Sequence, residues 1–261
     1  MAGPNAPKPI SLAIVGGGIG GLCLAVALVH HDVPVHVYEA APAFAEIGAG
    51  VGLGPNAMRA MALLDPAILE GYKRCETTNV SPAEQDRFFN FRYGMEKLSP
   101  EGMVAGELIC EVRSGGVTSS VHRARFLNEL VRLMPEGAAS FGKRLVEIEE
   151  GGEGVLLRFS DGTEARHDAV VGCDGIKSQM RKLLLGEGHE ASEAVFSWKC
   201  CYRGLAPADR AIEILGEDLA LESQMCKWSV PQIGAVTLTS QIWEMGVIYL
   251  RRRSSKVRLS I

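Results

Sequence analysis

Three glycines, Gly16, Gly18 and Gly21, have the spacing G-x-G-x-x-G and follow an apolar run that starts near Ile10. A continuous apolar pattern follows at once, so the segment predicts a strand, a tight turn and a helix. Glycines at this spacing let a backbone turn sharply, approach a pyrophosphate and pack helix on strand. The first turn of the helix then offers N–H groups to an anion. A glycine-rich turn that serves packing alone is the alternative.

A carboxylate, Glu39, stands at the end of a second predicted strand, residues 33–39, which alternates apolar and polar residues. Glu39 follows Gly21 by eighteen residues. An acid at this place accepts hydrogen bonds from the ribose hydroxyls of an adenine nucleotide, and its charge disfavours a ribose 2′-phosphate. The alternative is an ordinary exposed glutamate at a strand end.

A second glycine-rich segment, residues 48–56, contains Gly52 and enters a predicted helix at Pro55. Alternating glycines let the backbone pass close to a flat or bulky ligand, whereas a surface loop would explain them without a ligand. Further along, an apolar strand ends in Asp174-Gly175 before a polar helix start. Asp174 is therefore expected at the carboxyl end of a strand, where open α/β sheets bind ligands. A capping aspartate is the alternative.

A helix predicted over residues 121–134 has a basic start that contains Arg123 and Arg125. Cations are unfavourable at the N-terminal end of a helix because of its dipole. We therefore expect Arg123 or Arg125 to face an anion, and salt bridges to nearby acids would satisfy the same observation.

The 261 residues are 47% hydrophobic and 22% charged, with a net charge of −4. This length is enough for one large domain or two ordinary ones, and the charge gives no reason to expect nucleic acid or an acidic membrane as a partner. The seven cysteines include no C-x-x-C pair, so we expect neither a disulfide framework nor a metal site but reduced thiols in the cytoplasm. Glycines divide the apolar residues 10–29, so we expect no targeting segment and no membrane span.

The remaining pattern is typical of an α/β chain whose later part is rich in strands. We expect strands over 10–15, 88–93, 108–112, 144–149 and 154–167, with a hairpin turn at Asp161-Gly162; helices over 66–72 and 210–219; extended segments over 194–204 and 234–241; and a solvated basic tail over 251–261.

Taken together, these motifs resemble the flavin-dependent aromatic hydroxylases, the single-component FAD monooxygenases of the salicylate hydroxylase type. The resemblance covers residues 10 to about 207 and rests on 16–21, Glu39, 48–56, His122-Arg123 and 171–175, with 202–207 similar to the opening of the family's substrate-domain sheet.

The resemblance implies an incomplete Rossmann-like FAD-binding domain made of residues 1–72 and 100–188. It also implies a partial β-rich substrate domain made of 73–99 and 189–261, with an irregular basic C-terminal tail. In the first domain the glycines of the opening motif would approach the FAD pyrophosphate, and Glu39 would hold the adenosine ribose.

The resemblance also assigns roles to residues outside the first βαβ unit. Gly52 would lie in the loop that follows the flavin, Arg123 would contact the cofactor, and Asp174 would serve FAD directly and NAD(P)H transiently. Arg203 would be the catalytic candidate in the substrate pocket, where a cation can hold a phenolate or a carboxylate. An exposed strand residue is the alternative for Arg203.

The activity that the resemblance implies is hydroxylation of a small phenolic or aromatic-acid-like substrate with FAD, NAD(P)H and O2. The flavin carries the difficult chemistry in such enzymes. Two alternatives stay open: a non-catalytic nucleotide-binding remnant, and an NAD-dependent dehydrogenase, which shares only the first βαβ unit.

One departure from the family pattern lies towards the C-terminus. The family has a later Gly-Asp motif, whereas this sequence contains no Gly-Asp dipeptide and fits poorly beyond about Cys226. On this ground we expect a C-terminally truncated, alternatively spliced or misassembled product, with weak FAD retention and little hydroxylation by this chain alone.

Overall fold

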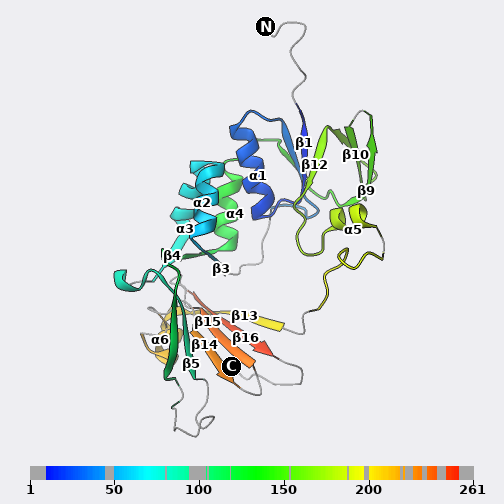
Figure 1. The fold of residues 1–261 in the computed structure, drawn as a ribbon. Coiled ribbons are helices and arrows are strands. Elements are labelled where there is room, and N and C mark those ends of the chain that lie inside the picture. Colours follow the sequence, from blue (N-terminus) through cyan, green and yellow to red (C-terminus); the bar gives the residue numbers. More distant parts are fainter. Residues whose placement is uncertain are drawn as a thin grey trace. The chain divides into compact units, whose positions relative to one another are not determined.

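The computed structural model (Figure 1) describes residues 10–44, 50–79, 81–93, 104, 106–117, 119–152, 154–186, 188–196, 200–217, 220, 226–230, 234–239 and 245–252. The chain divides into two compact units, and each is described by itself. The first unit comprises Met1–Ile47, Arg59–Arg74 and Arg123–Val195; the second comprises Gly48–Met58, Cys75–His122 and Phe196–Ile261.

A four-stranded parallel sheet forms the centre of the first unit, in the order β12–β1–β2–β8. Its strands are β1 (Leu12–Val15), β2 (Val35–Tyr38), β8 (Ala139–Ser140) and β12 (Ala169–Gly172). Ala13, Ile14 and Val37 are fully buried, as expected for parallel strands covered on both faces. The predicted α/β fold with a Rossmann-like sheet is confirmed.

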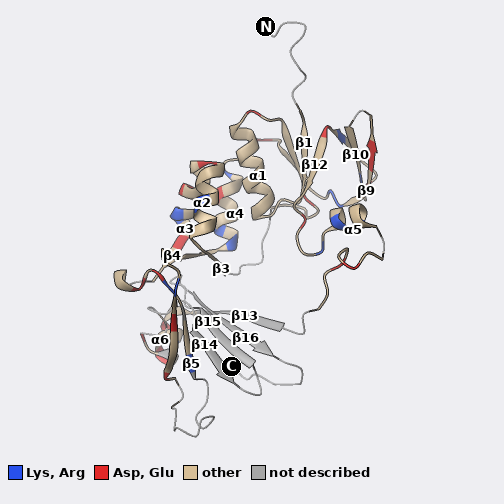
Figure 2. Cartoon of the chain, viewed as in Figure 1, with Lys and Arg blue, Asp and Glu red and all other residues tan. Residues whose placement is uncertain are grey.

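Helix α1 (Ile19–His30) connects β1 to β2, as the glycine motif predicts. Helices α3 (Pro66–Cys75), α4 (Arg123–Val131) and α5 (Gln179–Leu185) follow along the chain. In the first unit, the rings of Tyr72 and Phe126 meet edge-on with centroids 5.3 Å apart, which joins α3 to α4. Figure 2 shows charges of both signs on the helices of this unit.

The helix predicted over 121–134 is shorter than expected, because β7 (Ser119–His122) takes its first two residues. Val121 is fully buried in β7, which pairs with β3 and β4 in the second unit. Strand pairing, which helical periodicity does not report, therefore places Arg123 at the first position of α4.

An antiparallel meander completes the first unit, with β9 (Leu145–Gly151), β10 (Gly154–Phe159) and β11 (Glu164–His167). The predicted turn at Asp161-Gly162 is present, and Gly162 has a φ of +81°. Leu145, Leu157 and Phe159 pack in one cluster with Tyr38 and other residues of the parallel sheet.

An imidazole–phenol network lies within the first unit, in which Tyr38 is buried and His36 and His167 are half-buried. The Tyr38 hydroxyl is 2.8 Å from Nε2 of His167, and the His36 and Tyr38 rings are 4.8 Å apart. Burial lowers the pKa of both histidines; the charge of His167 adds to this effect at His36, whereas Asp168 opposes it at His167.

These depressed pKa values predict an acid-sensitive first unit. Below the ordinary histidine pKa of 6.5 the unfolded chain binds protons that folded His36 and His167 do not. Stability should therefore be fully present above pH 6.5 and fall as the pH is lowered from there towards the folded-state pKa values. Urea titrations at several pH values measure this slope. His167→Gln should flatten it, whereas His189→Gln, at an exposed histidine, should not; equal slopes in both variants would contradict the prediction.

The second unit consists mainly of strands. One three-stranded sheet has the order β3–β7–β4, with β3 (Gly50–Leu53) and β4 (Glu76–Thr78) at its edges. A six-stranded sheet has the order β13–β16–β15–β14–β5–β6, formed by β5 (Arg87–Tyr93), β6 (Leu108–Arg113), β13 (Cys200–Pro207), β14 (Cys226–Val230), β15 (Gly234–Thr239) and β16 (Met245–Arg252). A 3-10 turn, η1 (Pro82–Glu84), precedes β5, and α6 (Ala208–Leu215) follows β13.

Several expected element boundaries shift in the second unit. The glycine-rich segment 48–56 is not only a loop, because residues Gly50–Leu53 pair with β7; the helix α2 (Pro55–Leu64) begins at Pro55 as predicted. α6 ends at Leu215, followed by the C-cap Gly216 with a φ of +81°, rather than near residue 219. The expected basic tail starts within β16, and residues 253–261 lie outside the described residues.

Among the described residues, no helix has the length and apolar character needed to cross a membrane.

Candidate functional site

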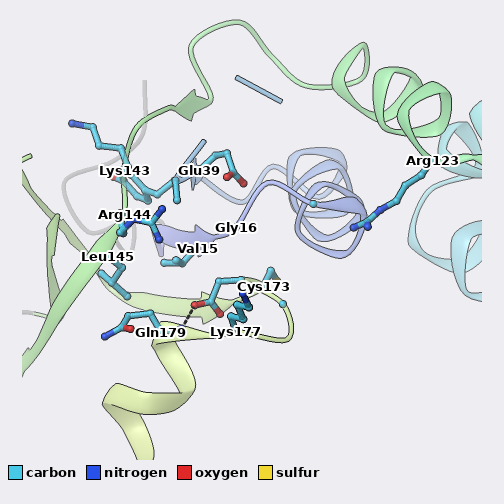
Figure 3. Close-up of a pocket in the computed structure, with 15 residues that line it drawn as sticks. Val15, Gly16, Glu39, Arg123, Lys143, Arg144, Leu145, Cys173, Lys177 and Gln179 are labelled. Atoms are coloured by element: carbon cyan, nitrogen blue, oxygen red, sulfur yellow. Dashed lines mark hydrogen bonds between the residues drawn. The ribbon is translucent and has the colours of Figure 1, made fainter. Parts of the chain in front are cut away.

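A pocket of about 310 Å³ opens in the first unit at the carboxyl ends of β1, β2 and β12 (Figure 3). This is the edge of a parallel sheet at which open α/β folds bind ligands. Its lining comprises Val15, Gly16, Gly18, Tyr38, Glu39, Ala40, Arg123, Lys143, Arg144, Leu145, Cys173, Asp174, Gly175, Lys177 and Gln179.

The three glycines of the motif have different surroundings. Gly16 has a φ of +108°, and a Cβ on it would lie 2.5 Å from the carbonyl oxygen of Cys173. A Cβ on Gly21 would lie 2.0 Å from the carbonyl oxygen of Gly16, so α1 packs directly on the turn. A Cβ on Gly18 would meet nothing within 4 Å, although Gly18 lines the pocket. Gly16 and Gly21 thus allow the turn and its packing, while Gly18 leaves space for a ligand.

This difference predicts that Gly18→Val reduces binding without unfolding the chain. Gly18 has φ −74° and ψ −179°, extended values that valine adopts readily. We expect the free energy of unfolding to change by less than about 1 kcal/mol. Nucleotide affinity should fall at least about tenfold, because the side chain fills space that a phosphate would occupy.

Isothermal titration with ADP measures the affinity of Gly18→Val. Gly20→Ala, whose Cβ also meets open space but lies outside the pocket lining, is the control; equal affinity in both variants would refute the role of Gly18.

Glu39 ties the end of β2 to the glycine turn. Its Oε2 accepts a hydrogen bond from the Gly17 N–H at 2.6 Å, and its Oε1 accepts one from the Ala41 N–H at 2.8 Å. A carboxylate has about four lone-pair positions, so acceptor capacity remains for two hydroxyl groups. The hydrogen bonding of Glu39 is compatible with a bound ribose. Glu39 also holds the backbone at Gly17 and Ala41, a structural role that the sequence did not indicate.

Asp174 both lines the pocket and caps α5. Its Oδ1 accepts a hydrogen bond from the Ser178 hydroxyl at 2.5 Å, and its Oδ2 accepts bonds from the N–H groups of Gln179 and Met180 at 2.6 and 3.0 Å. The capping alternative is therefore what the structure contains. A ligand role for Asp174 stays a prediction that its place in the pocket permits.

Four cationic side chains line the pocket, against the two carboxylates of Glu39 and Asp174. Lys143 donates to Oδ2 of Asp161 at 2.6 Å and to the Thr163 hydroxyl at 2.8 Å. The bond from Lys143, together with bonds that the Thr163 hydroxyl and N–H donate to Oδ1 of Asp161, lowers the pKa of Asp161 to about 2. The excess of positive charge favours an anionic ligand such as a pyrophosphate.

Five of the sequence-predicted residues line this one pocket: Gly16, Gly18, Glu39, Arg123 and Asp174. Gly21 lies in α1, in close contact with the turn. Gly52 lies in β3 and Arg203 in β13, both in the second unit, and the side chain of Arg203 lies outside the described residues.

The sequence motifs did not predict three of the cationic residues in the pocket: Lys143, Arg144 and Lys177. Lys143 and Arg144 stand directly before β9, more than a hundred residues after Glu39, and their adjacency to it depends on the tertiary fold. Lys177 lies two residues after Gly175. Its position close to the Asp174-Gly175 motif could have indicated that it belongs to the same site.

The residues present fit the adenosine diphosphate part of a dinucleotide. An open position at Gly18, the start of α1, a ribose-compatible carboxylate and a positive lining all meet in one cavity. Burial, together with the charge of Asp174, raises the pKa of the Cys173 thiol, so this cysteine stays protonated beside the site. Among the described residues, no group of three or more His, Cys, Asp or Glu side chains is arranged to hold a metal ion.

The parallel sheet and the glycine turn place the first unit in the Rossmann-like class of folds, in which such a turn is typical of dinucleotide binding. A family model described as an NAD(P)-binding Rossmann-like domain matches residues 14–45.

Relatives narrow this class further. A 6-methylsalicylate 1-monooxygenase of Aspergillus terreus is 47% identical over 213 residues, which cover 80% of this chain and 47% of the relative. A salicylate hydroxylase of Pseudomonas putida is 44% identical over 204 residues, which cover 77% of this chain and 44% of the relative. A solved salicylate hydroxylase substrate complex superposes with a TM-score of 0.76 at 30% identity, covering 97% of this chain and 58% of that one.

The chain is therefore a homologue of the FAD-dependent aromatic hydroxylases of the salicylate hydroxylase type, as its ordered motifs predicted. It spans about half the length of the curated relatives it matches.

Proposed function

We propose that this chain carries the nucleotide-binding part of an FAD-dependent monooxygenase that hydroxylates a small aromatic substrate with NAD(P)H and O2. The observation that carries the proposal is the pocket that joins the glycine turn, Glu39 and Asp174. It occurs in a chain that is 47% identical, over 213 residues, to a 6-methylsalicylate 1-monooxygenase. FAD is the cofactor, and a phenolic or aromatic-acid-like compound is the substrate class.

In this proposal the first unit binds the adenosine and pyrophosphate parts of FAD. The backbone at Gly18 and the start of α1 receive the pyrophosphate, and Glu39 accepts hydrogen bonds from the ribose hydroxyls. Arg123 contributes positive charge to the same pocket. When bound, the flavin supplies the activation of O2 that hydroxylation requires.

We propose that the substrate is bound in the strand-rich part of the chain, made of residues 73–99 and 189–261. Arg203, in β13, is our candidate for holding a phenolate or carboxylate group of the substrate. Gly52, in β3, is our candidate for the segment that follows the flavin. We also propose a cytoplasmic location, because the cysteine pattern is that of a protein with reduced thiols.

The test is an absorbance spectrum of the chain after incubation with FAD and removal of free flavin. NADH or NADPH oxidation and product mass are then measured with salicylate and related aromatic acids. We expect a flavin spectrum with weak retention of FAD, because the chain spans only about half the length of its relatives. NAD(P)H oxidation by this chain alone should be small, should increase when the aromatic acid is added, and should yield a product heavier by one oxygen atom.

Two results would favour the alternatives instead. Flavin binding without any NAD(P)H oxidation would support a non-catalytic nucleotide-binding protein. Binding of NAD in place of flavin, with oxidation of an alcohol substrate and no oxygen consumption, would support a dehydrogenase.

A further inference from the structure

The cationic side chains of the pocket differ in their bonding. Lys143 is engaged by Asp161 and Thr163, whereas the guanidinium group of Arg144 makes no hydrogen bond or ion pair within the part of the chain that the structure describes. Arg144 is solvent-exposed and lines the pocket. A cation at a cavity wall without a partner is available to a ligand.

The backbone around Arg144 is fixed on both sides. The Ser160 N–H donates to the Arg144 carbonyl oxygen at 2.9 Å, and the Lys143 N–H donates to the Glu39 carbonyl oxygen at 2.9 Å. Leu145, the next residue, is buried in β9 opposite Phe159. Arg144 is therefore held beside Glu39 by backbone contacts, and its side chain alone is free to adapt.

The order of residues along the pocket indicates which part of a bound nucleotide would lie next to Arg144. Figure 3 shows Arg123 and Arg144 on opposite sides of Gly16 and Glu39, with Lys143 and Leu145 beyond Arg144. The proposed pyrophosphate lies at the glycine turn and the proposed ribose at Glu39. In an adenosine nucleotide the base is attached at C1′ and the phosphate at C5′, so the two groups leave from opposite ends of the ribose ring. The group beyond Glu39, next to Arg144, is then the base.

We propose that Arg144 binds the adenine ring of the dinucleotide, with the guanidinium plane stacked on the purine. This inference rests on the proposed function, because it takes FAD as the ligand. Guanidinium groups are planar, weakly hydrated and stack on aromatic faces, which a lysine ammonium does not do. Buried Leu145 and Tyr38 also line this part of the pocket, and apolar surroundings suit a base better than a phosphate.

The test compares Arg144→Ala and Arg144→Lys with Arg166→Ala, which removes an exposed arginine of β11 outside the pocket lining. FAD and ADP affinities are measured by isothermal titration at low and high salt. We expect the dissociation constants of both ligands to rise about tenfold in Arg144→Ala. Most of this loss should persist in Arg144→Lys, which keeps the charge without the planar group. It should also persist at high salt, and the melting temperature without ligand should not change.

Three results would overturn the inference. They are unchanged affinities in Arg144→Ala, full rescue by Arg144→Lys, and a loss that disappears at high salt, since the last two are typical of a phosphate contact. If wild-type protein binds FAD in these cases, the proposed function stands without the inference. If the wild-type chain binds neither FAD nor ADP, both are wrong.

Discussion

Replacing Gly21 with alanine should destabilise the first unit by about 3 kcal/mol, at the upper end of the usual cost of overpacking and a large effect for one methyl group. The added Cβ would lie 2.0 Å from the Gly16 carbonyl oxygen, a backbone atom. Gly16 cannot retreat easily, because its N–H donates to the Tyr38 carbonyl oxygen at 2.8 Å and its own Cα faces the Cys173 carbonyl. Relief would require α1 to move away from the parallel sheet. Urea denaturation followed by circular dichroism measures the loss.

Gly20→Ala is the matched control for this prediction. Gly20 is the neighbouring residue in α1, and a Cβ on it would meet nothing within 4 Å. Alanine favours helix over glycine by up to about 1 kcal/mol, so this variant should be as stable as wild type or slightly more stable. A small and similar effect of both substitutions would mean that α1 does not pack on the turn as described.

Replacing Glu39 with alanine should weaken FAD binding by about tenfold to a hundredfold. The variant loses the proposed ribose acceptor, and it also leaves the N–H groups of Gly17 and Ala41 without their carboxylate. Hydrogen bonds to charged groups contribute about 1.5–3 kcal/mol each, which accounts for a change of this size. Isothermal titration with FAD measures it, and Glu150→Gln, at an exposed carboxylate of β9, is the control.

A nucleotide without ribose hydroxyls distinguishes the two roles of Glu39, which are contact with the ribose and support of the glycine turn. Wild-type protein should bind ADP more tightly than 2′,3′-dideoxy-ADP, and Glu39→Ala should bind the two about equally. If the variant is weaker for both nucleotides but keeps the full preference for ADP, Glu39 only holds the turn and does not contact the ribose.

The parts of the site that neighbouring residues determine could be predicted from the sequence. The glycine spacing and the position of Glu39 follow from one βαβ unit, in which strand, turn and helix are consecutive, and the structure brings Gly16, Gly18 and Glu39 into one pocket. Asp174 was placed at a strand end correctly because the apolar strand directly precedes it.

The parts that depend on distant pairing could not be predicted in the same way. Gly50 and Gly52 lie in a glycine-rich segment that local sequence predicts to be a loop. In the structure they form a strand, because β7, about seventy residues later, pairs with them. The same pairing removed His122 from the predicted helix and left Arg123 at its start. Arg144 has no motif of its own, and only the tertiary fold shows that it lies beside Glu39.

The central claim is that the first unit binds FAD through its adenosine diphosphate part. Titration of the purified chain with FAD, followed by the change in flavin fluorescence, tests it most directly. We predict one saturable site per chain, from which ADP displaces FAD completely and FMN does not. Absence of saturable binding, or binding of FMN that ADP fails to displace, would contradict it.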